Sequence, residues 1–157
     1  MPTQTFVEKR VSSQSATQPT PALRIAENIS RAVALAFLKA ETRENVFLIS
    51  RILKSGMDNP RDPTHGIFLG VFDDDQSLRG LCFLGNAGTL VVSVDEPRVA
   101  ELFAAAVFER GKRFTLAVGQ DDGLRAFLHT YVKLGGTKPV LDRRQPFYVL
   151  DSKSLAR

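Results

Sequence analysis

The chain has 157 residues, of which 43% are hydrophobic and 24% are charged. These values are typical of a globular domain and exclude a fibrous or wholly disordered chain. The only cysteine, Cys82, excludes an intramolecular disulfide and a zinc site built from several thiolates. The longest apolar run, residues 32–38, is too short to cross a bilayer, and the polar N-terminus has no secretory signal. We therefore expect a cytoplasmic protein without a membrane partner.

The charge is mildly positive, with 21 Lys and Arg against 17 Asp and Glu and a formal net charge of +4. The basic residues are scattered, and their densest groups are residues 110–113 and 143–144. Nucleic-acid-binding domains gather such residues along one face, often with aromatic side chains between them. The sequence shows no such stripe, so we do not expect a nucleic-acid partner.

The N-terminal residues 1–21 are polar, proline-flanked and without hydrophobic period, which predicts a disordered or loosely attached tail. Alternating residues at 22–26 indicate a short strand. Two helices follow, over about residues 30–40 and 43–54, and Gly56 ends the second. We expect their core-facing side chains to be Ile29, Val33, Phe37 and Ala40 in the first helix, and Val46, Ile49 and Leu53 in the second.

The hydrophobic period changes after a polar loop at residues 57–65. Residues 66–72, 78–84 and 89–94 are apolar segments separated by short turns, which is typical of an antiparallel meander. The first turn contains three consecutive aspartates, Asp73 to Asp75. We expect a solvated hairpin tip there and no metal site, because no further acidic ligand is near in sequence.

The chain then alternates between helix and strand. We expect Asp95 to cap a helix that ends at Gly111, with an inward apolar stripe of Val99, Leu102, Phe103, Ala106 and Val107. Asp121 or Asp122 should cap another helix that ends at residues 135–136. Between these helices lies a predicted strand at residues 113–118.

A last, interrupted strand is predicted at residues 140–141 and 146–150. The order β-α-α-β-β-β-α-β-α-β predicts an α/β fold in the broad sense, that is, an α+β domain. Its sheet should contain both parallel and antiparallel strands and carry helices on both faces. This domain spans residues 22–151, and residues 152–157 are a C-terminal tail or the start of a linker.

This order, together with several short motifs, resembles the GNAT superfamily of acetyl-CoA-dependent N-acetyltransferases. More narrowly, the chain resembles the uncharacterised N-terminal domain of certain two-domain bacterial GNAT proteins. The segments that carry the resemblance are Arg43–Ile49, Gly66–Val71, Gly80–Gly85, Val118–Gly119 and Arg144–Leu150. The resemblance implies a GNAT-like fold over about residues 22–151 and a catalytic acetyltransferase domain as a neighbour.

The segment that would hold the pyrophosphate of CoA departs from the family pattern. GNAT enzymes place a glycine-rich loop between the fourth strand and the next helix, because glycines let backbone amides approach the phosphates. The matching residues here, 93–98, contain no glycine. Asp95 and Glu96 add two carboxylates, and Pro97 removes an amide donor.

We therefore expect a non-catalytic domain without a cofactor, active in substrate recognition or assembly. Its partner would be a catalytic GNAT domain, in cis or in trans, or a second copy of itself. The alternative is an independent N-acetyltransferase that passes an acetyl group from acetyl-CoA to an amine, which needs only a base and a polarising amide. In that case acetyl-CoA would bind after residues 89–94, at Leu90, Val91, Val92, Ser93 and Arg98.

Three polar residues are candidates for substrate binding: Asn86 in a turn, and Gln145 and Tyr148 around the Pro146 break in the last strand. The competing interpretation is a turn-capping Asn and a hydrogen-bonded edge Gln.

No catalytic or metal-binding residue is predicted. His65 and His129 have no Cys or carboxylate at catalytic or ligand spacing. Cys82 lies between Leu81 and Phe83 in a predicted strand, a position typical of a small buried hydrophobic residue.

Overall fold

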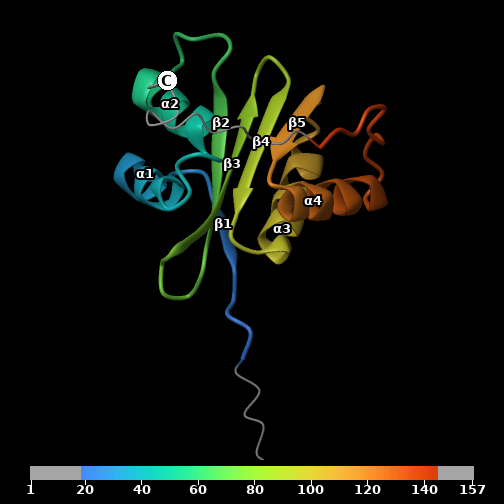
Figure 1. Cartoon of the computed structure of the whole chain (residues 1–157), viewed down its shortest axis with the longest axis horizontal. Coiled ribbons are helices and arrows are strands. Elements are labelled where there is room, and N and C mark those ends of the chain that lie inside the picture. The colour runs from blue at the N-terminus through green and yellow to red at the C-terminus, as the bar shows by residue number, and fades with distance from the viewer. Residues whose placement is uncertain (1–18, 145–157) are drawn as a thin grey trace, which may run out of the picture.

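The computed structural model describes residues 19–144, which form a mixed α+β domain (Figure 1). Five strands and four helices lie in this part of the chain. Their bounds are β1 Arg24–Ala26, α1 Arg31–Lys39, α2 Val46–Ser55, β2 Gly66–Phe72, β3 Leu78–Gly85, β4 Thr89–Val94, α3 Pro97–Arg110, β5 Leu116–Gly119 and α4 Asp121–Lys133.

The strands form one sheet in the order β1-β2-β3-β4-β5. Neighbours from β1 to β4 are antiparallel, which confirms the predicted meander. The pair β4–β5 is parallel, because α3 carries the chain back across the sheet between them. The mixed sheet predicted from the sequence is therefore present.

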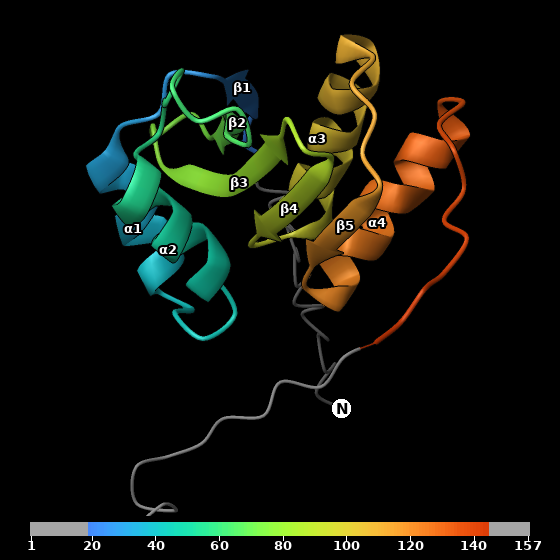
Figure 2. The same cartoon turned by 90° about the horizontal axis from the view of Figure 1, so that it is seen from above.

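Helices cover both faces of this sheet, as Figure 2 shows from above. Successive strand residues point to opposite faces, so the core divides in two. Leu69, Cys82 and Val92 pack with α3 and α4. Phe68 and Phe83 pack with α1 and α2.

The helix α3 has the inward face that its sequence predicts, with Val99, Phe103 and Val107 fully buried. Gly111 ends it in the left-handed conformation, at φ +64°. That conformation is costly for residues with a side chain and free for glycine.

The expected inward face of α2 is wrong. Val46 and Leu53 are 58% and 55% exposed, whereas Leu48 and Ile52 are buried. Of the three expected residues only Ile49 packs, partly buried, against the core. This helix is apolar around much of its circumference, so its sequence permits more than one inward face. The first helix is also rotated: α1 buries Ala34 and Leu38 and leaves Val33 and Ala40 exposed. The other two expected residues do face the core, since Ile29 is buried and Phe37 is partly buried.

The predicted last strand is absent at residues 140–141, where the chain is irregular and Val140 is fully exposed. No sheet neighbour pairs with this segment within the described residues, so its apolar pair has no ladder to join. The predicted continuation at residues 146–150 lies outside the described residues. Between residues 19 and 144 the helices all fall short of the length and apolar character that a bilayer crossing requires.

Candidate functional site

A groove of about 560 Å³ lies between the N-terminal end of α2, the β4–β5 pair and α4. Its volume is within the usual range for a small-molecule site. Apolar side chains from all four elements form its walls: Val46, Phe47, Leu48, Val91, Val92, Val118, Leu124 and Leu128. We call this hollow the β4–β5 groove.

The close approach of the end of β5 to β4 forms the floor of the groove. Val92 of β4 is the register partner of Gly119 of β5. A Cβ atom at Gly119 would lie 2.8 Å from the Val92 carbonyl oxygen, closer than real Cβ contacts come. The absence of a side chain at this position therefore lets the two strands meet before the chain turns into α4.

Charged side chains at the rim of the groove neutralise one another. Asp121 lies 2.8 Å from the Arg125 Nε and 2.9 Å from an Arg144 nitrogen. The hydrogen bond from Arg125 to Asp121 raises the pKa of that guanidinium. Glu44 accepts a hydrogen bond from the Gln120 amide. The rim therefore combines both signs of charge around an apolar interior.

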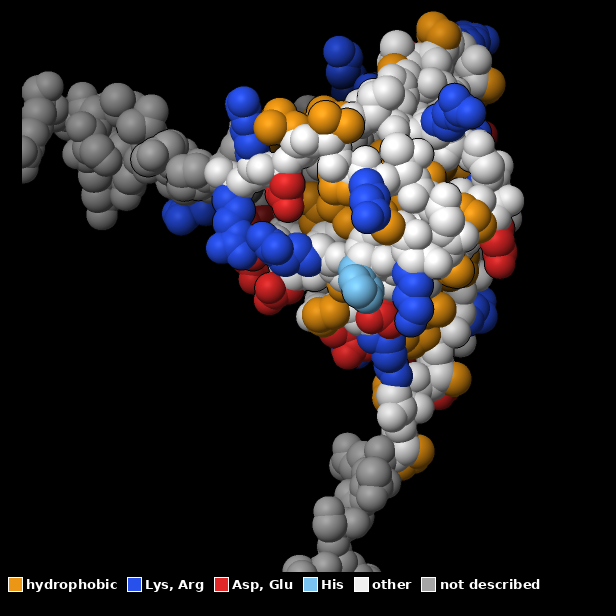
Figure 3. Space-filling view, turned by 90° about the vertical axis from the view of Figure 1, so that its right-hand side faces the viewer, with side chains coloured by type: hydrophobic (Ala, Val, Ile, Leu, Met, Phe, Trp, Pro, Cys, Tyr) orange, Lys and Arg blue, Asp and Glu red, His pale blue; other side chains and the backbone are white. Residues whose placement is uncertain are grey.

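The same mixture extends over the face that carries α4. Figure 3 shows Lys and Arg side chains on this face interspersed with acidic and hydrophobic ones. Among residues 19–144 the basic side chains on this face form no continuous stripe of the kind that binds nucleic acid.

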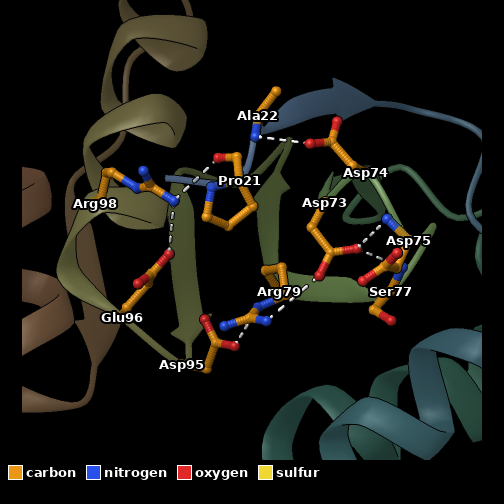
Figure 4. Close-up of polar contacts among 10 residues, drawn as sticks. All are labelled: Pro21, Ala22, Asp73, Asp74, Asp75, Ser77, Arg79, Asp95, Glu96 and Arg98. Carbon is orange, nitrogen blue, oxygen red and sulfur yellow. Dashed lines mark hydrogen bonds and ion pairs between the residues drawn. The ribbon is translucent and has the colours of Figure 1, made fainter. Parts of the chain in front are cut away.

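A separate polar network lies at the start of α3 (Figure 4). Asp95 lies 2.6 Å from the Arg79 Nε, and Arg79 also reaches Asp73 at 3.4 Å. Glu96 lies 3.2 Å from a terminal nitrogen of Arg98. Both arginines in this region thus have carboxylate partners from the chain itself.

The expectation that Asp95 caps α3 is wrong. Glu96 occupies the N-cap position, and no side chain accepts a hydrogen bond from the first turn. Asp95 points instead toward Arg79, because the β3 strand places a cation beside it. Burial raises the pKa of Asp95, while the attraction of Arg79 lowers it.

The structure brings together only part of the predicted cofactor set. Val91 and Val92 line the groove. Leu90 and Ser93 are buried beside them in β4 and do not line it. Arg98 lies elsewhere, in a shallower hollow of about 290 Å³ with Pro21, and donates to the Pro21 carbonyl oxygen at 3.4 Å.

The predicted substrate-binding residues are not assembled within the described residues. Asn86 is exposed in the β3–β4 turn, accepts a hydrogen bond from Lys112 at 3.1 Å and does not line the groove. Gln145 and Tyr148 lie outside the described residues.

The sequence reasoning missed Phe47, Gln120 and Arg125 as groove residues. The only signal was indirect: Phe47 is an apolar residue outside the expected inward face of its helix. Arg143 and Arg144, which the sequence analysis did not name as site residues, also line the groove.

The remaining reactive side chains do not form a catalytic centre in the described part. His65 is buried between Phe68 and Phe83, with Nε2 3.2 Å from the Met57 carbonyl oxygen. His129 is exposed on α4. Cys82 is fully buried, which raises the pKa of its thiol.

The Asp73–Asp75 turn is a hairpin tip built around Asp73. Its carboxylate accepts hydrogen bonds from the Asp75 and Ser77 amides at 2.9 and 3.0 Å. No group of three or more potential metal ligands occurs among residues 19–144.

Comparison of the chain with protein-family models, with curated proteins and with solved structures found no match.

Proposed function

We propose that this chain is a GNAT-like domain that does not transfer acetyl groups by itself. Its role is substrate recognition or assembly beside a catalytic acetyltransferase domain. The order of elements supports this proposal: two helices follow the first strand, a meander follows them, and a crossover helix leads to a parallel β4–β5 pair.

The residues at the start of α3 support the part of the proposal that denies catalysis to this chain alone. A CoA pyrophosphate placed there would meet Asp95 and Glu96, and Pro97 offers no amide hydrogen. Each carboxylate–phosphate contact at about 4 Å costs on the order of 1 kcal/mol even in water. Arg79 and Arg98 offset little of this cost, because they already pair with those carboxylates.

The β4–β5 groove favours the second candidate, an independent N-acetyltransferase. It is apolar and of ligand size, and two of the five predicted cofactor residues, Val91 and Val92, line it. Under this alternative the acyl arm of acetyl-CoA would occupy the groove, and the phosphates would find partners other than the α3 start.

Calorimetric titration of acetyl-CoA, followed by an amine acetylation assay, separates the two candidates. We expect no heat of binding, no thermal shift at millimolar acetyl-CoA and no transfer. Leu124→Trp fills the groove from α4, and Leu134→Trp places the same ring at the end of that helix, away from the groove. Micromolar binding that Leu124→Trp abolishes and Leu134→Trp preserves would overturn the non-catalytic proposal and establish the alternative site.

A further inference from the structure

The chain that follows α4 returns along that helix to the β4–β5 groove. Figure 2 shows residues 134–144 running back beside α4, from its end toward its beginning. At the end of this segment, an Arg144 nitrogen lies 2.9 Å from a carboxylate oxygen of Asp121, in the first turn of α4. Residues 142–144 also line the groove. The chain is therefore held at the rim of the groove at the point from which residues 145–150 continue.

The groove gathers apolar side chains that the described part of the chain leaves uncovered. Val46 and Phe47, at the start of α2, are 58% and 47% exposed, and Val118 of β5 is 45% exposed. About 560 Å³ remains open between these walls within residues 19–144. Single exposed apolar residues are ordinary on a protein surface, but a group that lines one hollow indicates a site for an apolar partner.

The residues that follow Arg144 have the composition that such a hollow requires. Residues 146–150 read Pro-Phe-Tyr-Val-Leu, with two aromatic side chains and no charged one. Residues 151–157, in contrast, include Asp151, Lys153 and Arg157. An extended chain advances about 3.3 Å per residue, so residues 145–150 reach about 20 Å from the rim, more than a hollow of this volume needs.

We propose that residues 146–150 of this chain occupy the β4–β5 groove and close it to other ligands. The covalent connection through Arg144 favours this segment over any free molecule. A short linker gives an effective concentration on the order of 1 mM, so a contact with a Kd of about 0.1 mM keeps about nine-tenths of the grooves filled. The aromatic side chains supply the contact, because each buries about 150–250 Å² in an apolar site.

This inference deepens the proposed function, because a groove filled by the chain itself has no room for the acyl arm of acetyl-CoA. It rests on that proposal only in taking the groove as the place where the arm would lie. The test below uses a fluorescent reporter and a cross-link, without acetyl-CoA or an amine. Failure of the docking and failure of the non-catalytic proposal are therefore read from different measurements.

A single tryptophan in the full chain tests the proposal, because the sequence contains none. Tyr148→Trp places this reporter within the docking segment. We expect its emission to be blue-shifted in the folded chain relative to the same chain in urea. Quenching by acrylamide should be at least about fivefold weaker in the folded chain, since about nine-tenths of the segment is bound.

A charge in the groove should release the reporter. Val46→Asp, added to Tyr148→Trp, places a carboxylate on the groove wall in the first turn of α2, and should shift the emission to the red and restore quenching. Val33→Asp makes the same change in the first turn of α1, at a valine that is 40% exposed and lies outside the groove. Its reporter should remain shielded. Val118→Asp repeats the release from the opposite wall, on β5.

A disulfide tests whether the segment enters the groove of its own chain. Val46→Cys combined with Tyr148→Cys should form an intramolecular disulfide on mild oxidation, seen as a monomer of altered mobility in a non-reducing gel. Ala36→Cys, at an exposed position of α1, combined with Tyr148→Cys should stay reduced. Cys82 is buried and does not compete.

Three results overturn the proposal. A reporter as accessible in the folded chain as in urea means that residues 146–150 do not fill the groove. A shielded reporter that neither Val46→Asp nor Val118→Asp releases lies against another surface. A disulfide that appears only as a covalent dimer shows that the groove takes the segment of a second copy.

Discussion

Gly119 provides the sharpest test of how the floor of the β4–β5 groove is built. Replacing it with alanine adds a Cβ atom 2.8 Å from the Val92 carbonyl oxygen and 3.4 Å from the Leu124 Cβ. The first contact is with backbone that the parallel ladder holds in place, so β5 must move away from β4. Overpacking of this kind costs about 1–3 kcal/mol.

A smaller effect acts in the opposite direction. Alanine restricts the unfolded chain more than glycine does, which stabilises the fold by about 0.4–1 kcal/mol where the backbone conformation suits alanine. The net expectation for Gly119→Ala is a loss of about 1–2 kcal/mol in the free energy of unfolding. At this chain length each kcal/mol lowers Tm by about 3 °C.

Urea denaturation followed by circular dichroism measures this loss, and Gly111 supplies the matched control. A Cβ at Gly111 meets nothing within 4 Å, but its φ of +64° disfavours alanine. Asparagine tolerates that conformation, so Gly111→Asn should recover stability relative to Gly111→Ala, whereas Gly119→Asn should be worse than Gly119→Ala. A Gly119→Ala chain as stable as the wild type would refute the close approach of the two strands.

Three further predictions concern individual titrating groups. Arg79→Met should raise the pKa of Asp95 further, because Arg79 lowers it against the effect of burial; an unchanged carboxyl titration by NMR would contradict the ion pair. Hydrogen bonds from Thr64 lower the pKa of Asp62, so Thr64→Val should raise it toward its ordinary value in the same experiment. A lowered folded-state pKa stabilises the fold above the unfolded pKa, and this contribution is lost as pH falls through the folded pKa. The stability difference between wild type and Thr64→Val should therefore vanish in acid, and a difference that persists there would contradict this cause. The Cys82 thiol should resist a thiol reagent in the native state and react on unfolding, because burial raises its pKa; rapid native labelling would show that the strand opens.

The local sequence determined most of the secondary structure. Strict spacing predicted the three meander strands and the inward face of α3, and the structure confirms both. These elements are predictable because their hydrophobic period matches a single way of facing the core.

The order of elements also predicted a mixed sheet with helices on both faces, since a meander followed by a crossover helix requires it.

Tertiary contacts decided the features that the local pattern left ambiguous. The inward face of α2 depended on which of its apolar sides met Phe68 and Phe83, and the sheet selected Leu48 and Ile52. Asp95 had two possible roles, and the position of Arg79 on the neighbouring strand made it an ion-pair partner and not a cap.

The candidate site could not be derived from the sequence as a unit. The groove joins the start of α2, the strand β4 and the consecutive pair β5 and α4. Other elements separate these three parts along the chain, so they meet only when the sheet forms. Val91 and Val92 were named from the sequence because a resemblance implied a ligand beside β4; the structure shows only that both line the groove. Phe47 and Arg125 were not named, because a side chain's membership of a cavity depends on the distance between elements in space, which hydrophobic period does not encode.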